Sequence, residues 1–269
     1  MTIFYERHGH GPDVVLVHGW GLHGGVWSDV ARGLSAEYRV TVPDLPGHGR
    51  SRDFLPREFT AEVLAEEVQR VLPGPAIWVG WSLGGFVALA AAQRVPQAVA
   101  KLVLVGATPK YVQSPDWPHA MSLTVLEQFA LNLEQDYAAT LDRFLSLQMA
   151  AGEDRVVLRR LRDELFRHGE PPAAALRQGL QLLKQEDRRA ALPGIAVPAL
   201  VVHGERDRIT PVGAARFLAA QLPQAQLELV PGAGHAPFLS HTPYFLEKLK
   251  DFIQYGKTSE RSEQGYING

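Results

Sequence analysis

The sequence contains no cysteine, and this absence excludes three kinds of chemistry. Disulfide bonds, thiol nucleophiles and zinc sites built on thiolates all require cysteine. An excess of one charge is also missing, because 27 basic and 29 acidic side chains leave a formal net charge of −2. This balance argues against bulk nucleic-acid binding and against a general electrostatic attraction to membranes. Function must therefore come from a local arrangement of side chains.

Long apolar runs are missing as well. No uninterrupted apolar stretch reaches the ~18 residues of a membrane-spanning helix. The first residues, MTIFYERHGHGPD, lack the basic segment followed by an apolar core that marks a signal peptide. These absences predict a cytoplasmic protein without membrane association.

The sequence does contain an alternation of short apolar strands and amphipathic helices. Apolar runs rich in β-branched residues predict strands at 14–17, 38–42, 76–79, 101–105, 198–203 and 227–230. Helical spacing and helix-forming composition predict helices at 60–72, 86–93, 212–222 and 243–253. Such an alternation favours the α/β class, with a mostly parallel, doubly wound sheet.

Between residues 111 and 189 the alternation stops, and Leu, Ala, Gln, Arg and Glu dominate. This composition predicts four helices, at 122–131, 134–149, 154–167 and 172–185. Helices inserted above the carboxyl ends of the strands would form a lid over a site there. We therefore expect a core at 1–110 and 190–255, a helical cap at 111–189 and a flexible C-terminal tail at 256–269.

A nucleophile motif lies between the strand at 76–79 and the helix at 86–93. Gly80-Trp81-Ser82-Leu83-Gly84 matches the pattern G-x-S-x-G, in which a serine sits on a sharp, strained turn from strand to helix. Side chains two residues before and after this serine would collide, and both positions are glycine here. The pattern predicts that Ser82 is a nucleophile rather than a serine that only caps the helix.

Such a serine needs an imidazole and a carboxylate, because its hydroxyl attacks only when a base takes its proton. Asp207 and His235 each follow a late predicted strand, and the order Ser…Asp…His is typical of α/β-hydrolases. Glu205 is a rival acid, but it comes earlier in the turn, where a salt link to a neighbouring arginine is expected. We therefore predict a catalytic triad of Ser82, Asp207 and His235.

Two backbone N–H groups are expected to form an oxyanion hole. One belongs to Leu83, directly after the nucleophile, and the other to Trp20, in the turn HGWG at 18–21 that follows the first predicted strand. His18 precedes this turn, and we interpret it as a histidine with local hydrogen bonds. Three polar residues of the turn at 43–51 are interpreted as groups that shape the turn rather than catalyse: Asp44, His48 and Arg50.

Six segments of the chain resemble one enzyme family. They are HGWG at 18–21, DLPGHGRS at 44–51, WVGWSLGG at 78–85, SPDWP at 114–118, RFLSLQ at 143–148 and GAGHAPFLSHTP at 232–243. Together they are similar to the carboxylesterases of biotin synthesis, the pimeloyl-[acyl-carrier protein] methyl ester esterase family, over nearly the whole chain except the tail. The segments around Ser82 and His235 alone would indicate only an α/β-hydrolase, whereas Trp81, DWP and RFLSLQ are far more specific.

This resemblance implies demethylation of a pimeloyl methyl ester carried on an acyl carrier protein. Ser82 would attack the ester carbonyl, and His235 would protonate the departing methanol. The reaction would need no metal and no organic cofactor, and a monomer is expected. The resemblance further implies an acyl site lined by Trp20, Ser82, Leu83, His235, Phe144, Leu145, Ser146, Leu147 and Gln148.

A basic stripe in the cap suggests how the carrier protein docks. Arg155, Arg159 and Arg162 fall at i, i+4 and i+7 and so share one helix face, and Arg143 and Arg160 could extend the basic surface. The family's acyl carrier protein is acidic, so a basic patch would steer and orient it. The alternative is an ordinary solvated helix face that nearby acidic residues partly neutralise.

Two other functions stay open from the sequence. A general short-chain esterase or a carbon–carbon bond hydrolase would use the same triad. A receptor or scaffold with a hydrolase fold would be non-catalytic, and the intact set of Ser82, Asp207 and His235 argues against it.

Overall fold

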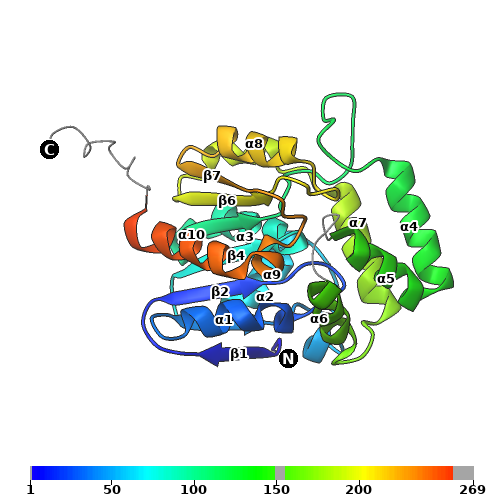
Figure 1. Cartoon of the computed structure of the whole chain (residues 1–269), viewed down its shortest axis with the longest axis horizontal. Helices are drawn as coiled ribbons and strands as arrows, with labels where there is room; N and C mark the ends of the chain where they lie inside the picture. Colours follow the sequence, from blue (N-terminus) through cyan, green and yellow to red (C-terminus); the bar gives the residue numbers. More distant parts are fainter. Residues whose placement is uncertain (1, 149–154, 257–269) are drawn as a thin grey trace, which may run out of the picture.

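The computed structural model describes residues 2–148 and 155–256 (Figure 1). Within them, seven strands form one sheet in the order β1-β3-β2-β4-β5-β6-β7. Neighbouring strands run parallel except β1, which pairs antiparallel with β3. The predicted α/β class with a mostly parallel sheet is therefore confirmed. The strands are Tyr5–His8 (β1), Asp13–Val17 (β2), Arg39–Pro43 (β3), Ala76–Trp81 (β4), Val99–Val105 (β5), Ala199–Gly204 (β6) and Ala225–Val230 (β7).

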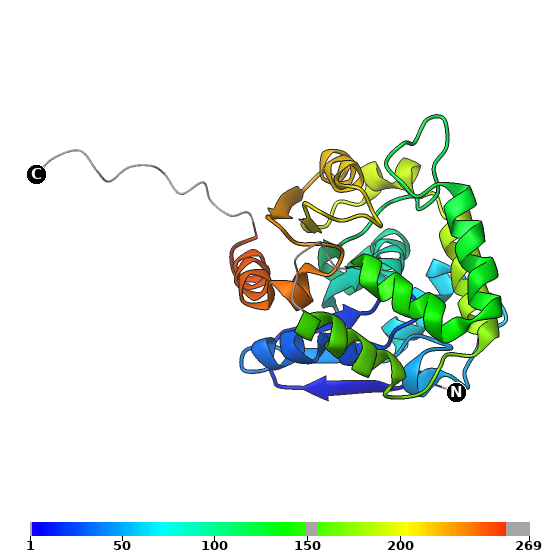
Figure 2. The same cartoon turned by 45° about the vertical axis from the view of Figure 1, so that its right-hand side comes forward.

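Helices cover the sheet on both faces. The side chains of β2, β4, β5 and β6 are almost all apolar and buried, as expected for strands covered on two sides. In Figures 1 and 2, α1 and α10 pack together on one face, and α2 and α3 pack together on the other. The core helices are Ser28–Leu34 (α1), Ala61–Arg70 (α2), Leu83–Arg94 (α3), Val212–Gln221 (α8), Pro237–Ser240 (α9) and Thr242–Tyr255 (α10).

Four further helices lie between β5 and β6 in the described part of the chain. They gather beside the sheet, on the right of Figure 1. We call residues 111–189 the cap, the division proposed from composition. The helices predicted there are confirmed, with ends shifted by up to four residues; predicted positions 149 and 154 and the tail from 257 on lie outside the described residues. In the described part of the chain, no helix is long and apolar enough to cross a membrane. The cap helices are Leu123–Gln135 (α4), Tyr137–Gln148 (α5), Arg155–Phe166 (α6) and Ala173–Gln185 (α7).

Three elements were not predicted from the sequence: β1, α1 and the short helix α9. All four residues of β1 are exposed at the sheet edge, so the strand has no apolar alternation. The short helix α1 buries only a few residues, and Gly33 lies against Leu246 of α10. The other predicted strands and core helices are confirmed, with ends that differ by at most three residues.

Candidate active site

Ser82 occupies a strained turn between β4 and α3. Its backbone has φ 54° and ψ −114°, and no other residue except glycine has a positive φ in the described part of the chain. Its N–H donates to the carbonyl of Val105 on the neighbouring strand (3.0 Å), and its carbonyl accepts from the N–H of Gly85 (2.8 Å). Such strain persists only where the surroundings hold it, and it clusters at active sites.

Two glycines make this turn possible. A Cβ on Gly80 would overlap the carbonyl of Gly84, and a Cβ on Gly84 would overlap the carbonyl of Val17 at the end of β2. Ser82 stands at the N-cap of α3, yet its side chain makes no capping hydrogen bond. The alternative that Ser82 only caps the helix is therefore not supported.

Asp207 and His235 come together from the loops after β6 and β7. His235 Nδ1 lies 2.7 Å from Asp207 Oδ2, and both side chains are buried. Burial alone would raise the pKa of the Asp207 carboxyl, but the interaction with His235 and the hydrogen bonds from His235 and Thr210 outweigh burial and lower that pKa. Asp207 is therefore ionised at neutral pH and can hold the His235 ring with Nδ1 protonated.

The other nitrogen of His235 is available for proton transfer. Nε2 is buried and has no hydrogen-bond partner among the described residues. Trp81, next to Ser82, donates its indole N–H to the carbonyl of His235 (2.9 Å), so one side chain ties the nucleophile turn to the histidine loop. The sequence alone predicts no role for Trp81, although its place inside the motif is a signal for one.

The rival acid Glu205 is exposed and lies outside this cluster. The salt link predicted for it is wrong, since no ion pair of Glu205 occurs within the described residues. Asp207 differs because its carboxylate is buried against His235. The described residues also contain no group of three or more His, Asp or Glu side chains that could hold a metal ion.

His18 holds the turn that carries Trp20. Its Nε2 accepts from the N–H of Leu45 (2.9 Å), and its Nδ1 donates to the carbonyl of Gly19 (2.8 Å). Burial lowers the pKa of His18 to about 3, so the ring is neutral, as these two bonds require. A Cβ on Gly19 would lie 3.4 Å from the Cβ of Ser82, which places this turn against the nucleophile. The interpretation of His18 as a locally bonded histidine is confirmed for Nδ1, whereas Nε2 bonds to Leu45, 27 positions along the chain.

Trp20 joins the same turn to the cap. Its indole N–H donates to the carbonyl of Leu176 in α7 (3.2 Å), and its ring meets Phe129 of α4 edge-on, with 5.5 Å between centroids. Gly179 of α7 leaves room for the indole, because a Cβ there would lie 2.5 Å from the ring. The Trp20 side chain therefore packs between the core and the cap. The backbone N–H groups of Trp20 and Leu83 stay the proposed oxyanion donors.

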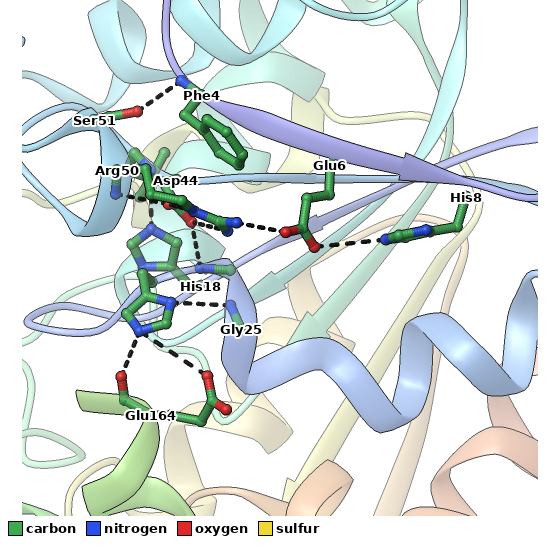
Figure 3. A network of polar contacts seen from close by, with 12 residues as sticks. Phe4, Glu6, His8, His18, Gly25, Asp44, Arg50, Ser51 and Glu164 are labelled. Carbon is green, nitrogen blue, oxygen red and sulfur yellow. Dashed lines mark hydrogen bonds and ion pairs between the residues drawn. The ribbon is translucent and has the colours of Figure 1, made fainter. Parts of the chain in front are cut away.

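A second polar network lies beside this turn (Figure 3). The buried Asp44 carboxylate accepts from the N–H of Gly24 (2.8 Å) and from the backbone N–H and Nε of Arg50 (2.9 and 2.8 Å). Arg50 also pairs with Glu6 of β1, and His48 Nδ1 bonds to a backbone carbonyl of the same turn (2.9 Å). The interpretation that Asp44, His48 and Arg50 shape the turn is confirmed.

His23 extends this network to Glu164 of the cap, which is labelled in Figure 3. Its Nε2 bonds to the backbone carbonyl of Glu164 in α6, and its Nδ1 accepts from the N–H of Gly25 (3.1 Å). Burial lowers the pKa of His23, and burial also raises the pKa of the Glu164 carboxyl. A neutral ring therefore connects the core to α6.

The structure describes only some side chains of the predicted acyl and docking sets. Leu145 is buried, whereas Ser146 is exposed and donates its hydroxyl to the carbonyl of Asp142 (2.9 Å). Arg162 pairs with the Asp142 carboxylate, which neutralises its charge. Arg143 and Arg159 are exposed. The predicted side chains that lie outside the described ones are those of Phe144, Leu147, Gln148, Arg155 and Arg160.

Comparison with known proteins places this chain in a family. A family model described as the alpha/beta hydrolase fold matches residues 12–242. Among solved structures, an esterase from Exiguobacterium antarcticum has a TM-score of 0.85 at 26% identity, and a bromoperoxidase from Bacillus anthracis has 0.84 at 28%; each match covers 93% of this chain and 95% of the other.

Curated relatives are much closer in sequence. A pimeloyl-[acyl-carrier protein] methyl ester esterase from Chromobacterium violaceum is 46% identical over 94% of this chain and 99% of its own. One from Xanthomonas oryzae pv. oryzae (strain MAFF 311018) is 45% identical over 91% and 96%. The chain therefore belongs to the alpha/beta hydrolase fold family and, within it, to the pimeloyl-[acyl-carrier protein] methyl ester esterase family.

Proposed function

We propose that this hydrolase converts pimeloyl-[acyl-carrier protein] methyl ester to pimeloyl-[acyl-carrier protein] and methanol in biotin biosynthesis. The observation that carries the proposal is the 44–46% identity to relatives of that name over 91–94% of this chain. The site supports it, because a strained serine and a buried histidine–carboxylate pair are parts that ester hydrolysis uses. We further propose that the reaction takes place in the cytoplasm, which is consistent with a carrier-bound substrate.

The first step is attack by Ser82 on the ester carbonyl. Nε2 of His235 takes the proton from Ser82 Oγ as the new C–O bond forms. The imidazolium is stabilised by Asp207, whose Oδ2 lies 2.7 Å from Nδ1. The carbonyl oxygen becomes an oxyanion that accepts hydrogen bonds from the backbone N–H groups of Trp20 and Leu83, and one such donor contributes about 10²–10³ in turnover.

The tetrahedral intermediate then collapses to an acyl-enzyme. His235 gives its Nε2 proton to the methoxy oxygen, methanol leaves and the pimeloyl group stays esterified to Ser82. Water next gives a proton to His235 and attacks the acyl carbonyl. When the second intermediate collapses, Ser82 regains a proton from His235, and the free carboxylic acid is released and loses its proton to water. Until this release every proton is moved by His235, so the cycle needs no cofactor.

The acyl chain is proposed to lie between core and cap, against the indole of Trp20 and the buried Leu145 of α5. The segment 144–148 would line the rest of this site. The proposed docking surface for an acidic carrier consists of the cap arginines. The exposed Arg143 and Arg159 suit that role better than Arg162, because Asp142 neutralises the latter.

A substrate panel tests the proposed activity. The purified protein is given carrier-bound methyl esters of several chain lengths, p-nitrophenyl acetate and a diketone substrate of carbon–carbon bond hydrolases. We expect kcat/KM for the carrier-bound pimeloyl ester to exceed that of the free short-chain esters. Equal rates on all esters would instead support a general esterase. Lack of turnover together with lack of fluorophosphonate labelling at Ser82 would support a non-catalytic protein.

A charge reversal tests the docking surface. Arg155→Glu with Arg159→Glu is expected to raise KM for the carrier-bound ester several-fold, and more at low salt, because rim charges steer association. Hydrolysis of a small free methyl ester should barely change. Arg32→Glu with Arg94→Glu is the matched control, since both arginines are exposed and lie outside the cap. If the control has the same effect, or if both substrates suffer equally, the docking proposal fails.

A further inference from the structure

The Asp207 carboxylate is held by more groups than the proposed triad supplies. Oδ1 accepts from the backbone N–H groups of Ile209 (2.8 Å) and Thr210 (2.9 Å). Oδ2, the oxygen that faces His235, also accepts from the Thr210 hydroxyl (2.7 Å). The same oxygen has His203 Nε2 at 3.4 Å. The side chains of Asp207, His203, Thr210 and His235 are all buried, so water does not replace these contacts.

We propose that Thr210 and His203 are positioning residues for the reaction, because together they keep Asp207 Oδ2 on the Nδ1 atom of His235 while the charge on that ring changes. The proposal rests on the proposed function only in taking Asp207 and His235 as members of the triad. Both residues act through Asp207 and not on the ester itself.

The Thr210 hydroxyl sits at the junction of the carboxylate and the imidazole. Its oxygen lies 2.7 Å from Asp207 Oδ2, 3.1 Å from the carbonyl oxygen of Gly106 and 3.3 Å from His235 Nδ1. A hydroxyl has one proton to donate, and the bond to the ionised carboxylate is both the shortest and charge-assisted. This bond, added to the two N–H bonds on Oδ1, resists rotation of the carboxylate away from the ring.

His203 fixes the backbone on which Thr210 stands. Its Nε2 lies 2.7 Å from the carbonyl oxygen of Thr210, and a bond to a carbonyl requires that this nitrogen carry a proton. Burial lowers the pKa of His203, so the ring is neutral. A neutral His203 ring places no second positive charge beside Asp207. The negative charge of Asp207 then stabilises only the imidazolium of His235.

The remaining titratable neighbour does not compete for this charge. Tyr111, at the start of the cap, is buried, and its burial together with the Asp207 charge raises the pKa of its hydroxyl, which keeps it neutral. Asp207 thus meets two histidines and one tyrosine, of which only His235 is expected to become charged during the reaction. His203, Asp207 and Thr210 all belong to one segment, HGERDRIT at 203–210, at the end of β6.

The test compares variants that remove or keep the proposed bonds. Thr210→Val removes the hydroxyl and preserves the shape, whereas Thr210→Ser keeps the hydroxyl. His203→Phe removes the ring donor, whereas His203→Gln keeps a donor near Nε2. Thr41→Val is the matched control, because Thr41 is also buried. Its hydroxyl accepts from Arg7 of β1, at the edge of the sheet opposite β6 and β7.

Each variant is assayed on methyl butyrate and p-nitrophenyl butyrate, which differ only in the leaving group. Methoxide must be protonated by His235, whereas p-nitrophenolate leaves without help. We expect Thr210→Val to lower kcat for the methyl ester about tenfold with KM unchanged within about twofold, and to lower kcat for the p-nitrophenyl ester less. Thr210→Ser restores kcat. His203→Phe acts in the same direction, and His203→Gln recovers part of the loss.

Proton NMR gives a second readout. The His235 Nδ1 proton, in its short bond to Asp207, should resonate far downfield and should shift in Thr210→Val but not in Thr41→Val. Equal losses on both esters, or a lower Tm with kcat and this resonance unchanged, would overturn the proposal. The proposed function can fail without this proposal. If the wild-type enzyme cleaves the butyrates but not the carrier-bound ester, the proposed substrate is wrong, and the comparison of variants on the butyrates still tests Thr210 and His203.

Discussion

The substitution Asp44→Asn removes one negative charge and almost no volume from the centre of the network in Figure 3. The carboxylate accepts from the N–H of Gly24 and from two nitrogens of Arg50, at 2.8–2.9 Å. An asparagine amide has only one acceptor oxygen, and its NH₂ group would face N–H donors. At least one of these bonds is therefore lost, and Arg50 loses its buried counter-charge.

The cost follows from the burial of the pair. Removing one partner of a buried ion pair destabilises a protein by about 3–5 kcal/mol. The Arg50 side chain is 22% exposed and keeps Glu6 as a second partner, so water and Glu6 recover part of its solvation. We therefore expect Asp44→Asn to lower the free energy of unfolding by about 3 kcal/mol, the lower end of this range. For a chain of this length, 1 kcal/mol shifts Tm by about 2–4 °C, which gives a fall of about 6–12 °C.

Urea unfolding at neutral pH, followed by circular dichroism and tryptophan fluorescence, measures this change. Asp13→Asn is the matched control, because Asp13 forms a similar two-bond pair with Arg39 (2.7 Å each), but the arginine is at the surface. Asp13→Asn should hardly change the urea midpoint, since ion pairs with an exposed partner contribute little to the free energy of unfolding. A loss below about 1 kcal/mol for Asp44→Asn, or one equal to the control, would refute the idea that this pair holds the turn.

Three further predictions concern the nucleophile, its turn and the buried histidines. Ser82→Ala should reduce ester hydrolysis below about 1% of wild type with an unchanged circular dichroism spectrum, and higher turnover would contradict its role as nucleophile. Gly80→Ala should sharply lower soluble yield and Tm, because its Cβ overlaps a carbonyl, whereas Gly74→Ala, with nothing within 4 Å, should change neither. Burial lowers the pKa of His18 to about 3 and of His48 to about 4, so below about pH 6.5 the unfolded state binds more protons than the folded one. The free energy of unfolding should then fall by about 2 kcal/mol per histidine between pH 7 and pH 5, and a value independent of pH would count against buried neutral rings.

Local signals in the sequence were enough to predict six of the seven strands in the described residues, most helices and the nucleophile turn. A buried parallel strand must be apolar on both faces, so it can be predicted from its own residues without knowledge of the strands it pairs with. The turn at Ser82 is equally local, because its strained backbone leaves no room for side chains at positions 80 and 84. Strand β1 was not predicted because all four of its residues are exposed and show no apolar pattern. It is a strand only because it pairs with β3.

Chain order also indicated which acid and which histidine to pair, since the carboxyl ends of parallel strands share one edge of the sheet. It could not supply the contact itself. The 2.7 Å bond between Asp207 and His235 and the Thr210 hydroxyl at the same oxygen depend on how the loops after β6 and β7 pack against each other.

Only the tertiary structure decided which polar residues support the site from a distance. Trp20 reaches Leu176 across 156 positions of the chain, and Asp44 binds the N–H of Gly24 across 20. Sequence spacing cannot encode such pairs, because hydrogen-bond partners are set by how the folded chain brings elements together. The chain itself therefore determined the elements and the reactive residues, and the packing of cap against core determined what holds them in place.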